Sequence, residues 1–288
     1  MTATVKPGPA RHTPAFLTIS AVFCILLASA RPAQAWYMTN NIAVAHVQDT
    51  SNTGMDQWTV GGTTELAQQS FWYRVGSSGG QTAVYGLPQL NISQSAVNTL
   101  TTENANSSLD FTINYTLTGG STGSGSSSIH ETINISNLTG SSIDLHFYQF
   151  LDLDLKGTAS GDTLQLGKTG SLFTGATQTD SNVIGGETLT TAANHGEAGL
   201  SSTLAGKVQS SSSPAALADN TSSVGPGNEA MAFEWDDNLA AHSSFTITID
   251  KTIGNTIPVP EPSTAGLLSL AFAGLVGRGL RRRSSASK

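Results

Sequence analysis

Cysteine and charge are the scarcest features of this 288-residue chain. The single cysteine, Cys24, lies in an apolar run near the N-terminus, so disulfides, thiolate metal sites and cysteine nucleophiles are excluded from the rest of the protein. Charged residues make up 11% of the chain, well below the roughly 25% of an average protein. Coiled coils and long charged helices are therefore excluded. The hydrophobic fraction of 38% is sufficient for a core and argues against wholesale disorder.

Basic residues are especially rare in the middle of the chain. Between residues 36 and 255, five Lys or Arg residues stand against nineteen Asp or Glu residues. Such an acidic surface repels phosphate backbones, so nucleic-acid binding is excluded, whereas divalent cations are attracted. The six histidines are scattered and form neither His-x-His nor His-Glu-x-x-His, which argues against a zinc hydrolase.

The N-terminus has the pattern of a secretory signal peptide, residues 1–35. A positively charged start and an apolar stretch (residues 15–30) precede the small-x-small sequence that signal peptidase accepts, Ala33-Gln34-Ala35. Cleavage is therefore expected before Trp36. An uncleaved membrane anchor is the alternative.

The C-terminus combines a stiff element, an apolar run and a basic cluster. Pro260, Glu261 and Pro262 form an extended, helix-free element, because proline fixes its own backbone and restricts the residue before it. The apolar run that follows (residues 265–276) is shorter than the roughly 20 residues of a full membrane span. The basic cluster behind it is expected to stop transfer and stay in the cytoplasm; it comprises Arg278, Arg281, Arg282 and Arg283.

These three parts, in this order, resemble the PEP-CTERM protein-sorting signal of Gram-negative bacteria. The resemblance implies that exosortase, a membrane-embedded cysteine protease/transpeptidase, recognises the Pro-Glu-Pro element. It also implies export through an inner-membrane intermediate to the cell surface or extracellular matrix, in a host that makes exopolysaccharide. An ordinary C-terminal anchor is the alternative. The expected organisation is a signal peptide, a β domain (36–254), a linker (255–259), the sorting signal (260–283) and a cytoplasmic tail (284–288).

The central region alternates apolar and polar residues with the period of two that is typical of β-strands. Clear examples are residues 109–117, 129–135 and 245–249. Many such strands indicate an all-β fold, an antiparallel β-sandwich or jelly roll. No segment has a convincing helical stripe with caps. The Gly/Ser-rich segment 119–128 is expected to connect a hairpin, and residues 210–229 to form a lid, a binding loop or a tolerated insertion.

Acidic residues supply the candidate ligands for a cation. In the strand expected at residues 143–155, Asp152 and Asp154 lie on the polar face, about 7 Å apart by the strand rise. With Asp162 from the following turn they offer the carboxylate oxygens that Ca²⁺ prefers. The alternative is a solvated sheet face. A second acidic group at a strand end contains Glu234, Asp236 and Asp237.

Three functions are compatible with these features. The leading expectation is an exported, exosortase-processed surface or matrix protein with a non-enzymatic structural or adhesive role. The first alternative is a carbohydrate-binding module for exopolysaccharide. Aromatic rings for it are supplied by Phe71-Trp72-Tyr73, with Trp58 and Trp36, unless these pack in the core. The second is a polysaccharide hydrolase, which needs two carboxylates facing each other across a cleft.

Overall fold

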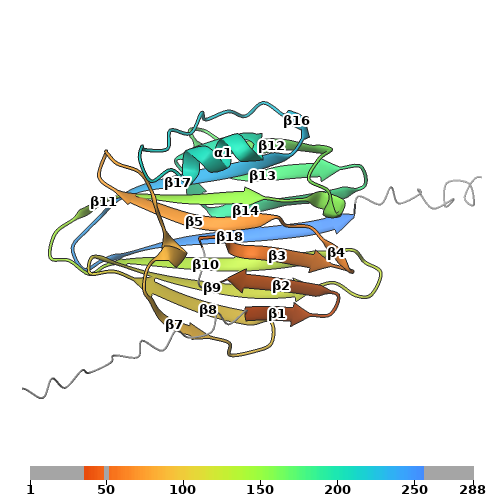
Figure 1. Ribbon diagram of the computed structural model, residues 1–288, viewed down its shortest axis with the longest axis horizontal. Coiled ribbons are helices and arrows are strands. Elements are labelled where there is room, and N and C mark those ends of the chain that lie inside the picture. The colour runs from red at the N-terminus through yellow and green to blue at the C-terminus, as the bar shows by residue number, and fades with distance from the viewer. Residues whose placement is uncertain (1–35, 49–51, 256–288) are drawn as a thin grey trace, which may run out of the picture. The chain divides into compact units, whose positions relative to one another are not determined.

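The computed structural model describes residues 36–48 and 52–255, which form two nine-stranded sheets packed face to face (Figure 1). The expectation of an all-β, sandwich-like fold is confirmed. The expected signal peptide, the Pro-Glu-Pro element, the apolar run and the arginine cluster lie outside the described residues. Within the described ranges, no helix is long and apolar enough to cross a membrane.

The first sheet contains the N-terminal strands and the strands that carry the candidate site. Its order is β1 (Trp36–Asn40), β2 (Ala43–Gln48), β3 (Gly54–Val60), β5 (Gln68–Val75), β11 (Ile143–Asp152), β17 (Glu229–Leu239) and β15 (His195–Leu200). Two short strands attach to this path, β4 (Thr63–Thr64) on β3 and β6 (Thr82–Ala83) on β5. Pairing is antiparallel except for a brief parallel contact between β3 and β5.

The second sheet is antiparallel throughout and contains the long alternating strands found in the sequence. Its order is β16 (Val224–Gly227), β12 (Asp162–Thr169), β13 (Leu172–Asp180), β14 (Val183–Ala193), β18 (Ser244–Asn255), β10 (Ser127–Asn137), β9 (Leu109–Gly119), β8 (Thr99–Ala105) and β7 (Gln89–Ser93). The Gly/Ser-rich segment joins β9 to β10 as a hairpin, as expected.

The main core lies between the two sheets because each strand turns alternate side chains inward. Phe147 on β11 stacks with Phe71 on β5 and Phe111 on β9, so aromatic rings from both layers meet at the centre. Trp58, one of the sequence's candidate aromatics, is also buried, and its indole N–H donates to Ser127 across the sandwich.

A charged network is buried inside this apolar core. Lys251 on β18 forms an ion pair with Glu131 on the neighbouring strand β10. The side-chain amide of Gln69 donates to Glu131 (2.8 Å), and that of Gln149 donates to Glu187 on β14 (2.8 Å). These bonds join the first sheet to the second. One lysine therefore faces two carboxylates in a region that water does not reach.

A second, smaller core covers part of the outer face of the first sheet, the face turned away from the second sheet. It is formed by Leu204 and Val208 of helix α1 (Ser201–Val208), packed over outward-facing side chains of β5, β11 and β17: Trp72, Tyr148, Phe150, Ala230 and Ala232. The expectation of no helix is wrong at α1, which is eight residues long and lacks a side-chain N-cap, so the usual sequence signals are missing. Two 3₁₀ turns complete the fold, Val84–Gly86 and Leu155–Gly157.

Candidate functional site

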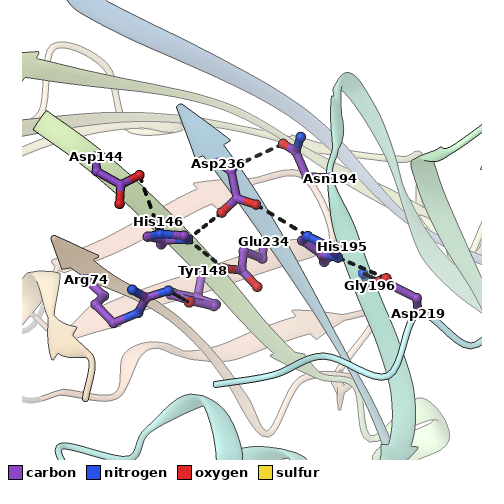
Figure 2. A network of polar contacts seen from close by, with 10 residues as sticks. All are labelled: Arg74, Asp144, His146, Tyr148, Asn194, His195, Gly196, Asp219, Glu234 and Asp236. Atoms are coloured by element: carbon purple, nitrogen blue, oxygen red, sulfur yellow. Dashed lines mark hydrogen bonds and ion pairs between the residues drawn. The ribbon is translucent and has the colours of Figure 1, made fainter. Parts of the chain in front are cut away.

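Three adjacent strands of the first sheet, β11, β17 and β15, place a polar cluster on its outer face (Figure 2). The register sets His146 opposite Asp236, and sets Glu234 opposite both Tyr148 and His195. These residues alternate with core residues such as Phe147 and Trp235, which point to the other sheet. The two faces of the same strands therefore serve the core and the cluster separately.

His146 bridges the two carboxylates of β17. Its Nδ1 lies 3.0 Å from an oxygen of Glu234 and 2.5 Å from an oxygen of Asp236 (Figure 2). Its Nε2 lies 3.7 Å from the exposed carboxylate of Asp144. The imidazole is thus fixed by Glu234 and Asp236, and its second nitrogen has only a longer contact with an acid at the surface.

His195 links the cluster to the irregular segment that follows α1. Its Nδ1 lies 2.9 Å from Asp219, and its Nε2 lies 3.4 Å from Asp236. Asp219 also accepts a hydrogen bond from the backbone N–H of Gly196 (3.1 Å). Next to it, Asn220 both donates to and accepts from the backbone of Ala198. The segment 209–223 is therefore attached to the edge strand β15 at Asp219 and Asn220.

The solvent exposure of the side chains decreases from His195 through Asp236 to Glu234. The side chain of His195 is 42% exposed and that of Asp236 is 32% exposed, whereas Glu234 is 7% exposed. Behind Glu234 lie the buried Tyr148 and Arg74, whose guanidinium Nη2 donates to the Tyr148 hydroxyl (3.3 Å). A ligand can therefore reach His195 and Asp236 from solvent, with Glu234 at the floor of the cluster.

The pKa shifts follow from this arrangement. Burial raises the pKa of Glu234; hydrogen bonds from Tyr148 and His146 oppose this rise, and the charge of Asp236 adds to it. Burial alone would lower the pKa of His195. The hydrogen bond and charge of Asp219, with the charges of Glu234 and Asp236, outweigh burial, so the pKa of His195 is raised. The cluster thus contains a carboxyl group and an imidazole whose pKa values are both raised, the kind of perturbation found at acid–base sites.

The same cluster has the ligand atoms for a metal ion. One atom each from His146, Glu234 and Asp236 lies within 4.8 Å of the others. No other group of three or more His, Cys, Asp or Glu side chains in the described part of the chain brings its ligand atoms this close together. One nitrogen and two carboxylate oxygens suit a divalent transition metal such as Zn²⁺.

The acidic residues singled out in the sequence fall into two places. Glu234 and Asp236 enter the cluster, and Asp237 lies opposite Leu145 on the other side of the strand. Asp152 and Asp162 are buried elsewhere, at the end of β11 and the start of β12, and Asp154 lies between them. The alternative of a solvated face does not hold for the end of β11 that carries Asp152, because Tyr148 and Phe150 on that face are covered by the second core. At the start of the strand, Asp144 on the same face is exposed.

The aromatic candidates do not form an exposed stacking platform. Phe71 and Tyr73 pack in the main core, and Trp72 packs on the opposite face in the second core. Trp58 is buried as well, so these rings serve packing in the described fold.

The two histidines of the cluster could not be found from sequence motifs. His146 and His195 are far apart in the chain and meet because β17 pairs with β11 on one side and β15 on the other. The usable signal is the polar residue pattern His-x-Tyr on one strand and Glu-x-Asp on another, both on non-core positions. The pattern becomes a site because the strand order places these strands next to one another.

The family model of the PEP-CTERM protein-sorting motif matches residues 258–283 of this chain. The resemblance drawn from the tail is thereby confirmed. The motif implies export and processing by exosortase, with a membrane-anchored sorting signal. Comparison with curated proteins finds no match.

The fold is similar to solved structures of carbohydrate-processing enzymes. A bacterial glucoamylase complexed with acarbose has a TM-score of 0.54 at 11% identity, covering 84% of this chain but 36% of the glucoamylase chain, so this protein spans about a third of that one. A putative aldose 1-epimerase from Escherichia coli K12 has a TM-score of 0.53 at 8% identity, covering 78% of this chain and 100% of the other. An aldose epimerase homologue from C. elegans has a TM-score of 0.50 at 8% identity, with 78% and 99% covered.

These likenesses correct the functional expectation. At such low identity they show the fold, and it is the fold of proteins named as enzymes that act on sugars. The expectation of a non-enzymatic structural or adhesive protein is contradicted, and the carbohydrate-directed alternatives are better supported. The chain thus combines a PEP-CTERM sorting signal with a sandwich similar to those of aldose epimerases.

Proposed function

We propose that the protein is an exported carbohydrate-processing enzyme whose outer-face cluster catalyses proton transfer at the anomeric centre of a sugar. The observation that carries the proposal is the convergence of two imidazoles and two carboxylates on one face of three strands. The similarity of the fold to aldose epimerases adds support. A sugar's hemiacetal needs one base and one acid, and the cluster contains both.

In the proposed reaction, Glu234 is the base and His195 the acid. The carboxylate of Glu234 takes the proton of the anomeric hydroxyl, and the imidazolium of His195 gives its proton to the ring oxygen. The bond between the anomeric carbon and the ring oxygen breaks, leaving an aldehyde. Rotation of the aldehyde and the reverse proton transfers close the ring with inverted configuration, so atoms and charges balance without a co-reactant. His146 positions both carboxylates.

Glycoside hydrolysis fits the geometry less well. Glycosidases hold two carboxyl groups on opposite sides of the scissile bond, about 5–5.5 Å apart in retaining enzymes and about 6.5–9.5 Å apart in inverting ones. Here the oxygens of Glu234 and Asp236 that face His146 lie within 4.8 Å of each other. Both side chains also project from the same face of β17. They do not flank a bond.

The sorting signal gives the setting of the proposed activity. Export places the domain outside the cytoplasm after signal peptidase cleaves before Trp36 and exosortase processes the tail. We propose the cell surface or extracellular matrix as the final location and the host's exopolysaccharide, or sugars released from it, as the carbohydrate encountered there.

Mutarotation tests the activity directly. The purified protein is added to freshly dissolved α-D-glucose or α-D-galactose, and the change in optical rotation is compared with the uncatalysed rate. Loss of the acid or base is expected to reduce the catalysed rate by about 10²–10⁴-fold in His195→Gln and Glu234→Gln. The control Asp237→Asn removes a charge from the neighbouring position of the same strand and should keep the rate. A wild-type protein that does not exceed the uncatalysed rate with any aldose would refute the proposal.

A chelator distinguishes proton transfer by side chains from metal-assisted chemistry. Activity that survives dialysis against EDTA supports the acid–base assignment. Activity that is lost and returns only with Zn²⁺ would instead assign His146, Glu234 and Asp236 as metal ligands.

A further inference from the structure

Two carboxylates outside the outer-face cluster are buried and have oxygens without a hydrogen-bond partner. Asp162, the first residue of β12, is 0% exposed, and Asp152, the last residue of β11, is 7% exposed. Neither oxygen of Asp162 has a hydrogen-bond partner, and Oδ1 of Asp152 has none either. Oδ1 of Asp154, between the two strands, is likewise buried and unpartnered.

These carboxylates form one group together with Asp180, the last residue of β13. β12 pairs with β13 from Thr163 opposite Thr179, so Asp162 and Asp180 are neighbours at the next position, and the Asp180 carboxylate lies against Gly161. Burial raises the pKa of Asp162, the Gln178 side chain opposes the rise, and the charges of Asp180, Asp154 and Asp152 add to it. Among the described residues, no ion pair reaches any of the four. The side-chain ammonium of Lys156 contacts Ser181 at 3.4 Å instead.

A buried carboxylate without a hydrogen bond or a counter-charge is expensive. Removal of an ionised group from water costs several kcal/mol, so such a group either takes up a proton or binds a cation. The hydroxyl of Ser201 satisfies one oxygen of Asp152 (2.5 Å), and Thr158 and Ser181 contact Asp180 (3.3 and 2.9 Å). The unpartnered oxygens of Asp152, Asp154 and Asp162 remain.

We propose that Asp152, Asp154 and Asp162 bind a Ca²⁺ ion, with Asp180 as a further ligand. The donors are oxygens alone, which favours Ca²⁺ over Zn²⁺, and no histidine or cysteine is in the group. Their carboxylates do not converge as closely as the ligand atoms around His146. A bound ion would draw the carboxylates together by rotation of their side chains.

Such an ion would join separate parts of the fold. Asp152 ends a strand of the first sheet, whereas Asp162 and Asp180 belong to the second sheet. Ser201, which donates to Asp152, is the first residue of α1, the helix that covers the outer face beside the sugar site. Figure 1 shows α1 and β12 at the same end of the molecule. Ca²⁺ is therefore expected to stabilise the sandwich and the helix together.

Thermal unfolding of the exported protein with defined metals tests the site. The melting temperature at pH 8 is measured in EDTA, in ~10 mM CaCl₂ and in ~10 mM MgCl₂. If the dissociation constant for Ca²⁺ is about 1 mM, mass-action linkage and the size of the domain give a rise in melting temperature of about 3–6 °C. Mg²⁺ should have a smaller effect because it loses its water ligands reluctantly.

Two variants and a control locate the effect. Asp162→Asn should abolish the Ca²⁺-dependent shift and raise the melting temperature in EDTA, because repulsion is relieved. If that variant does not fold, the less buried Asp154→Asn should still reduce the shift. Asp110→Asn, on β9, should retain it in full. No shift with Ca²⁺, an equal shift with Mg²⁺, or a full shift in the variant that folds would overturn the proposal. Failure here leaves the mutarotation test unaffected, because the two sites share no ligand.

Discussion

Glu187 makes the pH dependence of stability a quantitative test of the charged network in the core. Burial raises its pKa from an ordinary 4.5 to about 7, although Lys251 and the hydrogen bond from Gln149 lower it, and Glu131 adds to the rise. Lys251 is already paired with Glu131. When both carboxyl groups are ionised, one of them therefore remains without a full counter-charge in the core.

The sign follows from proton binding. Between pH 4.5 and about 7, the folded protein holds the Glu187 proton while the unfolded chain has released it. Folded protein thus binds more protons, and the free energy of unfolding falls as pH rises through this window. A shift from 4.5 to about 7 corresponds to roughly 3 kcal/mol at most. Below pH 4.5 the penalty disappears.

The substitution Glu187→Gln removes the titration and keeps an oxygen that can accept from Gln149. Urea unfolding of both proteins is measured from pH 4.5 to pH 8, and the difference in unfolding free energy is plotted. We expect the variant to gain up to about 3 kcal/mol relative to wild type across this range. Because Asp152 and Asp162 titrate in both proteins, their contributions cancel. A control, Glu103→Gln on β8, should give a flat difference. A flat difference for Glu187→Gln as well would refute the reasoning.

Three further predictions concern the network, the site and the tail. Lys251→Met should destabilise the protein by about 3–5 kcal/mol, measured by urea unfolding, because buried Glu131 loses its ion pair and buried Glu187 loses a nearby positive charge. Asp219→Asn should lower the pKa of the His195 imidazole, measured by NMR titration, since Asp219 is the strongest influence that raises it. Replacement of Pro260-Glu261-Pro262 by alanines should leave membrane insertion intact but block release in an exosortase-bearing host; equal release of both forms on a fractionation blot would show that the element is not recognised.

The sequence was sufficient to predict the sheets because alternation is a local property. Phe111, Ile113 and Tyr115 on β9 face the core as their spacing predicts, and Phe147 on β11 does the same. Strand order is not local, so the pairing of β17 with β11 and β15 could not be read from the chain. For that reason the sequence identifies Glu234 and Asp236 as a pair of acidic residues at a strand end but not as partners of His146.

The irregular segment after α1 shows why the candidate site escaped sequence reasoning. The sequence predicts a lid, a binding loop or a tolerated insertion for residues 210–229, and the structure places Asp219 of this segment against His195. Nothing in the Ser-rich composition indicates that contact. It depends on the edge position of β15, whose backbone groups are free to pair with Asn220.

The outer face of β17 shows how packing sets the limits of the site. Going along the strand, Ala230 and Ala232 lie under α1, whereas Glu234 and Asp236 lie beyond this cover. Small side chains let the helix approach the sheet, and the larger acidic ones begin where the helix no longer excludes water. Glu234 stands at this boundary, where burial is sufficient to raise its pKa and His195 is still open to solvent. A helix over the whole face would bury the cluster. If the helix were absent, Glu234 would be an ordinary surface acid. The position of α1 therefore contributes to the proposed chemistry as directly as the residues that touch the sugar.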